Sequence, residues 1–172
     1  YFFRNNKRYK GNKVQLDPIP RTVLVPGLGV FGLGQSVKSA TVAADLLETN
    51  ISVITKAEAM GKYVVIPEKD VFDMEYWSLE QAKLGKNTER PLSRKIVIIT
   101  GGASGIGEAI AKAFFNEGAE VCILDKNLIE AERVALLVHG LAIKCDVTKE
   151  NEVEKAFKKV VKLMGGLDIV VS

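Results

Sequence analysis

The sequence predicts an α/β protein in which residues 91–172 form part of a doubly wound parallel sheet, preceded by a mainly helical segment. Short, uniformly apolar runs suit strands that are buried on both faces, as strands of a parallel sheet are. Stretches with helical spacing alternate with these runs, and a glycine-rich turn follows the first run directly. The four expected strands are Ile96–Ile99, Val121–Leu124, Leu141–Cys145 and Leu167–Val171.

Three helices are expected between these strands. The first covers Glu108–Phe115 and the second covers Asn127–His139, each with an apolar stripe that would pack on the sheet. Thr148 is expected to cap the third helix, which Gly165 would end. The expected buried face of the third helix consists of Val153, Phe157, Val160, Val161 and Met164.

Residues 1–90 are expected to form a separate, mainly helical domain. Tyr1–Lys13 is basic and aromatic but has little apolar periodicity, so we expect a surface segment there. Helical spacing covers residues 35–60 and Val71–Leu84. The polar stretch Gly85–Pro91 marks the expected domain boundary. Three aromatic residues are expected in packing rather than in a ligand site: Phe72, Tyr76 and Trp77.

A second glycine pattern lies in this first part of the chain. Gly27–Gly32 matches G-x-G-x-x-G and follows a short strand candidate at Arg21–Val25. A dinucleotide site also needs a following strand that ends in an acid at a fixed distance. The expected helix over residues 35–60 occupies that distance, so the sequence predicts no second dinucleotide site here.

The stretch from Lys95 to Gly107 combines a buried strand, a glycine-rich turn and the start of a helix. Backbone N–H groups and the positive end of the helix dipole at such a turn favour an anion. Glycine is needed where a Cβ atom would block the turn or the approach of a pyrophosphate. Asp125 ends the second strand about 20 residues later, where a carboxylate can bind ribose hydroxyls.

The spacing Thr100-Gly101-x-x-x-Gly105-x-Gly107 resembles the turn of the short-chain dehydrogenase/reductase family. Asp146-Val147 resembles the adenine-contacting pair of that family. The glycines alone would also suit a turn that only connects a strand to a helix, but the two later matches favour a cofactor site. The resemblance implies a Rossmann sheet with strand order 3-2-1-4. The cofactor-binding residues that it implies are Thr100, Gly101, Ser104, Gly105, Ile106, Gly107, Asp125, Asp146 and Val147.

The expected cofactor is NAD rather than NADP. The Asp125 carboxylate would accept hydrogen bonds from the ribose of NAD and would repel the 2′-phosphate of NADP. Lys126 follows directly and would soften that repulsion.

Residues 21–48 resemble the closing strand and helix of the class II aldolase/adducin family. Residues 71–85, joined by a short linker to a dehydrogenase, resemble the bifunctional rhamnulose-phosphate aldolase/alcohol dehydrogenase proteins. Such aldolases carry a zinc-binding His-Gly just before the glycine that opens the helix. If Gly34 is that glycine, Leu28-Gly29 occupies the place, and leucine cannot bind zinc. We therefore expect no metal site.

The family resemblance implies catalysis by a Tyr-x-x-x-Lys pair, in which the Lys lowers the pKa of the Tyr. All four tyrosines precede the expected sheet, so no catalytic residue is expected in this sequence. Since the chain begins at Tyr1 and stops at Ser172, we expect a fragment of a longer polypeptide. The intact protein would oxidise or reduce an alcohol or aldehyde. The alternative is a non-catalytic nucleotide-binding or interaction fragment.

Composition and charge indicate which classes of partner are not expected. The net charge is +3 and the lysines are scattered, so no nucleic-acid surface is expected. No membrane span or signal peptide is visible, and both cysteines fall in expected buried strands, which indicates a cytoplasmic protein. The fourth strand, Leu167–Val171, would be an edge without Lys or Pro. Such an edge invites pairing with another chain, so we expect either that a longer polypeptide continues beyond this strand or that the fragment associates with itself through it. A homo-oligomer is the expected assembly.

Overall fold

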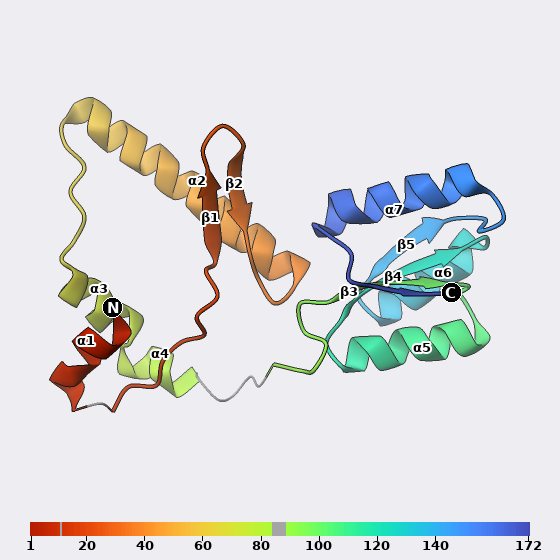
Figure 1. Cartoon of the computed structure of the whole chain (residues 1–172), viewed down its shortest axis with the longest axis horizontal. Coiled ribbons are helices and arrows are strands. Elements are labelled where there is room, and N and C mark those ends of the chain that lie inside the picture. Colours follow the sequence, from red (N-terminus) through yellow and green to blue (C-terminus); the bar gives the residue numbers. More distant parts are fainter. Residues whose placement is uncertain (11, 84–88) are drawn as a thin grey trace. The chain divides into compact units, whose positions relative to one another are not determined.

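The computed structural model describes residues 1–10, 12–83 and 89–172 (Figure 1). The chain divides into two compact units. The first unit consists of Tyr1–Leu33 and Ala43–Thr88, and the second consists of Gly34–Val42 and Glu89–Ser172.

The second unit is built on a parallel sheet of four strands. These are β3 (Ile96–Thr100), β4 (Glu120–Asp125), β5 (Leu141–Lys144) and β6 (Ile169–Val171). Their order in the sheet is β5-β4-β3-β6. The expected doubly wound arrangement, with strand order 3-2-1-4, is therefore confirmed.

Helices cover both faces of this sheet (Figure 1). They are α5 (Gly105–Asn116), α6 (Leu128–Leu137) and α7 (Glu150–Met164). Because side chains alternate along a strand, Val97 and Ile99 pack with α5 and α6, whereas Ile98 packs with α7. All three of these side chains are fully buried. Each such side chain stabilises the fold by about 1.5–3 kcal/mol.

Helix α5 begins earlier than the sequence predicts. Ser104 is the N-cap residue and has an extended backbone (φ −158°, ψ 170°), so the helix starts at Gly105 rather than at Glu108. The poor helix propensity of glycine hides this start in the sequence. As a result, Gly105 and Gly107 belong to both the turn and the first helical turn.

Two details of α7 also differ from expectation. The N-cap residue is Lys149 and not Thr148, because the Thr148 hydroxyl and N–H both donate to Asp146 Oδ1 (2.8 and 3.1 Å). Val161 is 49% exposed, so the buried face contains Ala156 in its place, together with the expected Val160. Gly165, with φ 87°, ends the helix as expected.

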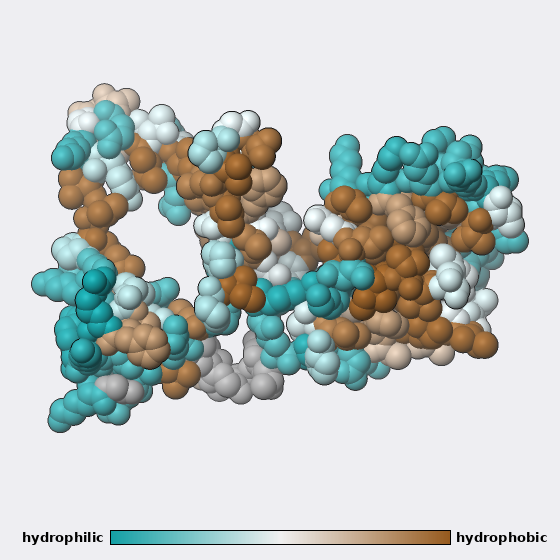
Figure 2. All heavy atoms as spheres, in the orientation of Figure 1, coloured by the Kyte–Doolittle hydropathy of each residue, from teal (hydrophilic) through white to brown (hydrophobic). Residues whose placement is uncertain are grey.

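The edges of the sheet are β5 and β6. Figure 2 shows hydrophobic residues gathered between α7 and α5 on the side where β6 forms the edge, and Val170 of β6 is 48% exposed.

In the first unit, the N-terminal segment is not merely a surface segment. It forms α1 (Phe2–Asn6) and a short 3-10 helix, η1 (Lys7–Tyr9). Phe2 packs against Phe72 and Tyr76, with ring centroids 6.0 and 5.1 Å away. A helix of five residues is too short to show a hydrophobic period, which is why the sequence pattern does not reveal it.

The expected single helix over Val71–Leu84 is two helices, α3 (Glu68–Glu75) and α4 (Ser78–Lys83). The break lies at Trp77, whose carbonyl accepts from Gln81 N (2.9 Å) and so opens α4. Trp77 is 57% exposed, so the packing prediction is right for the other two aromatic residues and wrong for Trp77. Leu84 and residues 85–88 of the expected linker lie outside the described residues.

The second glycine pattern is part of a β-hairpin. Strands β1 (Thr22–Val25) and β2 (Gly29–Gly32) pair antiparallel, and both Gly27 and Gly29 have positive φ angles (79° and 128°). Helix α2 (Val37–Met60) follows close to the expected bounds. The pattern therefore belongs to a strand–turn–strand unit and not to the strand–turn–helix of a dinucleotide site.

A close approach at the start of β5 gives a stability prediction. A Cβ atom on Gly140 would lie 2.2 Å from Val121 O of β4, a backbone atom that cannot move cheaply. Gly140→Ala should therefore lower the free energy of unfolding by about 1–3 kcal/mol, measured by urea denaturation. The matched control is Gly166→Ala, whose Cβ would meet nothing closer than Ile96 Cδ1 at 3.9 Å. Equal losses in the two variants would contradict the prediction.

Candidate functional site

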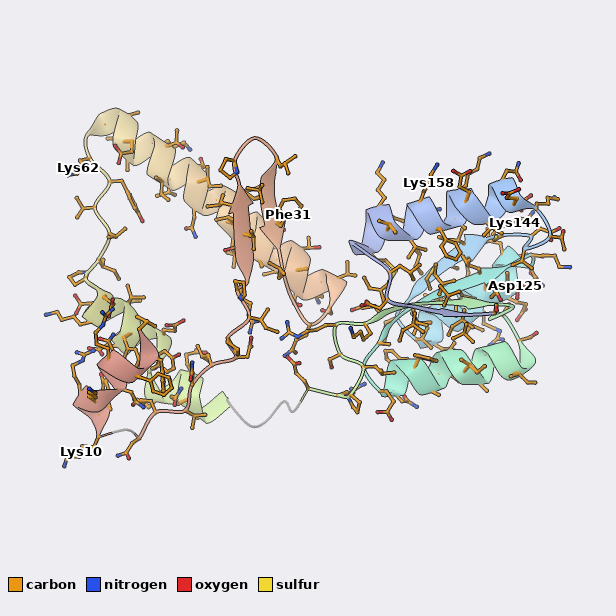
Figure 3. All side chains as sticks on the ribbon, viewed as in Figure 1. Lys10, Phe31, Lys62, Asp125, Lys144 and Lys158 are labelled. Atoms are coloured by element: carbon orange, nitrogen blue, oxygen red, sulfur yellow. The ribbon has the colours of Figure 1, made fainter. Side chains whose placement is uncertain are left out.

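The topology brings the expected site residues to one end of the sheet, where the strands have their carboxyl ends. Thr100 ends β3, Asp125 ends β4, and Asp146 and Val147 follow β5 after one intervening residue. Asp125 is in register with Lys144, and Figure 3 shows both at the same end of the sheet. Ligands of open α/β sheets bind outside this end of the strands.

The turn between β3 and α5 folds back closely on itself. Gly101 and Gly105 have φ angles of 61° and 55°, which side chains disfavour. A Cβ atom on Gly107 would lie 2.2 Å from Gly101 O, so the start of α5 can approach the turn only without a side chain at this position. Gly101 N donates to Leu124 O (2.8 Å), which joins the turn to the next strand.

The N-terminus of α5 is open to a ligand. Ser104, the N-cap residue, makes no side-chain cap hydrogen bond. The first N–H groups of a helix have no acceptor within the helix, and they carry the positive end of its dipole. Beyond its chain neighbours and its own helix backbone, no part of the described protein would lie within 4 Å of a Cβ atom on Gly105, and Ile106 is 81% exposed. An anion can therefore approach these N–H groups.

The Asp125 carboxylate is fixed beside this turn. Its Oδ2 accepts from Ala103 N (3.2 Å) in the turn, and its Oδ1 accepts from Asn127 N (2.9 Å) at the start of α6. These two backbone donors hold the carboxylate between the glycine turn and the next helix. A ligand hydroxyl at this edge of the sheet would meet an oriented acceptor.

Asp146 and Val147 form the third part of the site. Hydrogen bonds from Thr148 lower the pKa of Asp146, so this carboxyl stays ionised at neutral pH. The backbone N–H of Asp146 donates to Glu152 Oε2 of α7 (2.9 Å). Val147 is 55% exposed and presents an apolar surface at this end of the sheet.

Sequence reasoning missed Arg133, a residue of α6 that reaches the glycine turn. Its Nη2 donates to Ala103 O (3.3 Å) and to Glu108 Oε2 of α5 (2.8 Å), and its Nε donates to Glu130 Oε2 (2.7 Å). Lys112 also donates to Glu108 (2.6 Å). The two cations lower the pKa of Glu108 to about 2, with Arg133 as the larger cause. Only the spacing of Glu130 and Arg133 within one helix is visible in the sequence.

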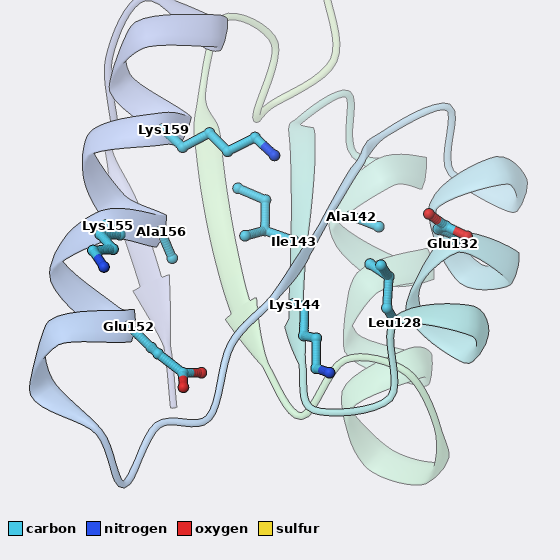
Figure 4. Close-up of a pocket in the computed structure, with 9 residues that line it drawn as sticks. All are labelled: Leu128, Glu132, Ala142, Ile143, Lys144, Glu152, Lys155, Ala156 and Lys159. Carbon is cyan, nitrogen blue, oxygen red and sulfur yellow. The ribbon is translucent and has the colours of Figure 1, made fainter.

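A hollow of about 620 Å³ lies along the edge strand β5 between α6 and α7 (Figure 4). Acidic and basic side chains surround an apolar floor there. The lining residues are Leu128, Glu132, Ala142, Ile143, Lys144, Glu152, Lys155, Ala156 and Lys159.

Within the described ranges, no group of three His, Cys, Asp or Glu side chains lies close enough together to hold a metal ion. No helix in the part of the chain that the structure describes has the length and apolar character to cross a membrane. Cys122 and Cys145 are buried free thiols on the α7 side of the sheet, and burial raises the pKa of Cys122 to about 12.

Family models match both parts of the chain. The model "short chain dehydrogenase" matches residues 95–172. Residues 95–172 belong to the short-chain dehydrogenase family. The model "Aldolase class II, second domain" matches residues 1–84, ahead of the dehydrogenase segment. Both family resemblances, and their order in the chain, are confirmed.

Individual relatives agree with this assignment. An uncharacterized oxidoreductase of Bacillus subtilis, YuxG, is 37% identical over all of this chain, which spans 26% of that protein. Short-chain dehydrogenase reductase 3c of Arabidopsis thaliana is 46% identical over 84 residues, which are 47% of this chain and 33% of the relative. The chain therefore spans about a quarter to a third of the length of these relatives.

Among solved structures, a 3-ketoacyl-(acyl-carrier-protein) reductase from Brucella melitensis, complexed with NADH, is 39% identical and aligns with a TM-score of 0.44. The alignment covers 45% of this chain and 33% of that structure.

The ion pair between Glu108 and Arg133 gives a pH prediction. The pKa of Glu108 falls from 4.5 to about 2 on folding, so its stabilising effect is complete above pH 4.5 and is lost as the pH falls toward 2. Glu108→Gln should therefore lower the melting temperature most above pH 4.5, and this difference from the wild type should shrink at lower pH. Glu154→Gln is the control, because Glu154 forms an exposed pair with Lys158 on the surface of α7. A constant difference between pH 7 and pH 2 would refute the expectation.

Proposed function

We propose that the dehydrogenase segment binds a nicotinamide dinucleotide at the carboxyl ends of its strands. The observation that carries this proposal is the glycine turn, which opens the uncapped N-terminus of α5 directly beside the fixed Asp125 carboxylate. In this arrangement the pyrophosphate meets the N–H groups of the turn, and the adenosine ribose meets Asp125. Asp146 and Val147 line the place for the adenine. The residues in these roles are Thr100, Gly101, Ser104, Gly105, Ile106, Gly107, Asp125, Asp146 and Val147.

The preferred cofactor is NAD rather than NADP. Two backbone donors hold the Asp125 carboxylate at the end of β4, where the ribose would lie. Its negative charge would lie against the 2′-phosphate of NADP, whereas the 2′-hydroxyl of NAD would donate to it. The adjacent Lys126 reduces this discrimination without reversing it.

The reaction class is oxidation or reduction of an alcohol or aldehyde by the whole protein. Family membership of residues 95–172 supports an oxidoreductase. No Tyr-x-x-x-Lys follows Thr100 in this sequence, so we assign no catalytic residue within it. The 172 residues alone are expected to bind the cofactor without turnover.

The order of the two family matches supports a bifunctional protein, in which a sugar-phosphate aldolase precedes an alcohol dehydrogenase. We place the domain boundary near residue 90, with residues 1–90 in the aldolase part and 91–172 in the cofactor-binding part. Leu28 and Gly29 lie in the β-hairpin, and they occupy the place of a zinc-binding His-Gly if Gly34 is the glycine that opens the helix. We therefore assign no metal ligand in the aldolase part of this chain.

Cofactor choice tests the role of Asp125. In the whole protein, NAD should bind more tightly than NADP, and Asp125→Asn should shift the ratio of the two dissociation constants toward NADP by about tenfold. The shift arises because the amide removes the negative charge next to the 2′-phosphate. Both constants are measured by isothermal titration calorimetry.

The matched control is Asp168→Asn. Asp168 also accepts from a backbone N–H, that of Ile96 (2.8 Å), but it precedes β6 at the opposite end of the sheet. This variant should lose similar stability with no change in cofactor preference. An unchanged ratio in the Asp125 variant, or equal binding of NAD and NADP by the wild type, would refute the assignment.

A further inference from the structure

Both polar backbone atoms of Ala103 are held by side chains from the next strand and helix. Ala103 lies in the middle of the glycine turn and is 2% exposed. Its N–H donates to Asp125 Oδ2 (3.2 Å), and its carbonyl accepts from Arg133 Nη2 (3.3 Å). This residue of the turn is thus held from two directions. The Asp125 contact belongs to the site already described, whereas the Arg133 contact has no role there.

Two carboxylates orient the Arg133 guanidinium toward Ala103. Glu108 accepts from Nη2 (2.8 Å) and from Nη1 (3.4 Å), and Glu130 accepts from Nε (2.7 Å). A planar guanidinium that is held along two edges has a defined plane, which a lysine ammonium cannot reproduce. Because Glu108 lies in the first turn of α5, Arg133 joins α6 to the helix whose N-terminus faces the expected ligand.

The charges around Arg133 indicate that it acts through geometry rather than through attraction of the ligand. Glu108 and Glu130 balance the positive charges of Arg133 and Lys112. Glu108 is the more sheltered partner, with its side chain 19% exposed, against 45% for Arg133. The donors of the guanidinium are directed at protein acceptors, and a turn that already has its binding shape loses less entropy when a ligand binds.

We infer that Arg133 is a positioning residue of the dinucleotide site, which holds the Ala103 carbonyl so that the glycine turn is shaped for a pyrophosphate before the ligand arrives. This inference rests on the proposed binding of a nicotinamide dinucleotide. It adds a residue of α6, outside the glycine pattern, to the part of the site that recognises the pyrophosphate.

The test compares ligands with and without a pyrophosphate in the whole protein. Arg133→Met should weaken the binding of NADH and of ADP-ribose about tenfold, which corresponds to the loss of one charge-assisted hydrogen bond. Adenosine, measured by competition or by ligand-observed NMR, should change less than about twofold, since it does not contact the pyrophosphate turn. Arg133→Lys keeps the charge but not the planar fork, so it should fail to restore NADH binding.

The control variant is Lys158→Met, which removes a cation from an exposed pair on α7 (side chains 75% and 64% exposed), away from the turn. It should leave all three affinities unchanged. Melting temperatures of all variants identify any general loss of folding. Glu108→Gln should also weaken NADH binding. The double variant, Glu108→Gln with Arg133→Met, should bind NADH as tightly as Arg133→Met alone, because both changes break the same contact.

The outcomes separate this inference from the proposed function. A wild-type protein that does not bind NADH would overturn the proposed function and the inference with it. Normal NADH binding by the wild type together with unchanged binding by Arg133→Met would overturn the inference alone. Full rescue by Arg133→Lys, or an equal loss for adenosine and ADP-ribose, would also overturn it, because either result excludes a geometric role at the pyrophosphate turn.

Discussion

The approach of helix α5 to the turn that precedes it is the constraint on which the second unit depends. A Cβ atom at Gly107 would stand 2.2 Å from the carbonyl oxygen of Gly101, so the helix starts where it does only because this residue has no side chain. Because α5 starts so close to the turn, its first N–H groups lie at the carboxyl ends of the strands, next to the end of β4. Asp125 at the end of β4 and Arg133 of α6 then both reach Ala103 in the turn, through its N–H and its carbonyl respectively.

Much of the second unit could be predicted from the sequence because local pattern and tertiary environment agree there. The strand runs around Ile98 and Cys122 are apolar on both faces, and both faces are covered in the structure. The glycines and Asp125 carry their information in spacing along one chain segment. By contrast, the link from Arg133 to Glu108 joins residues 25 positions apart on two helices, and no short-range pattern encodes it.

In the first unit, less of the structure could be predicted from the sequence. Long helical spacing identified α2, but the packing of Phe2 on Phe72 joins segments far apart in the sequence and has no period to reveal it. The sequence predicts one helix across α3 and α4 because the apolar spacing continues past Trp77, whereas the helical conformation is interrupted there. The sequence also places the start of α5 too late, because the poor helix propensity of glycine hides a first helical turn that contains Gly105 and Gly107. Hydrophobic pattern thus reports which face is buried more faithfully than where an element begins.

The buried thiols have a practical consequence for following the motions of the sheet. Cys122 lies fully buried in β4, and its environment raises its pKa to about 12, so in the folded state it offers almost no thiolate to an alkylating reagent at neutral pH. Modification must therefore wait until β4 separates from α7, and its rate measures how often this opening occurs. The alkylation rate of the native Cys122 thiol therefore reports on the exposure of the strand that carries Asp125, and no cysteine has to be introduced by mutation.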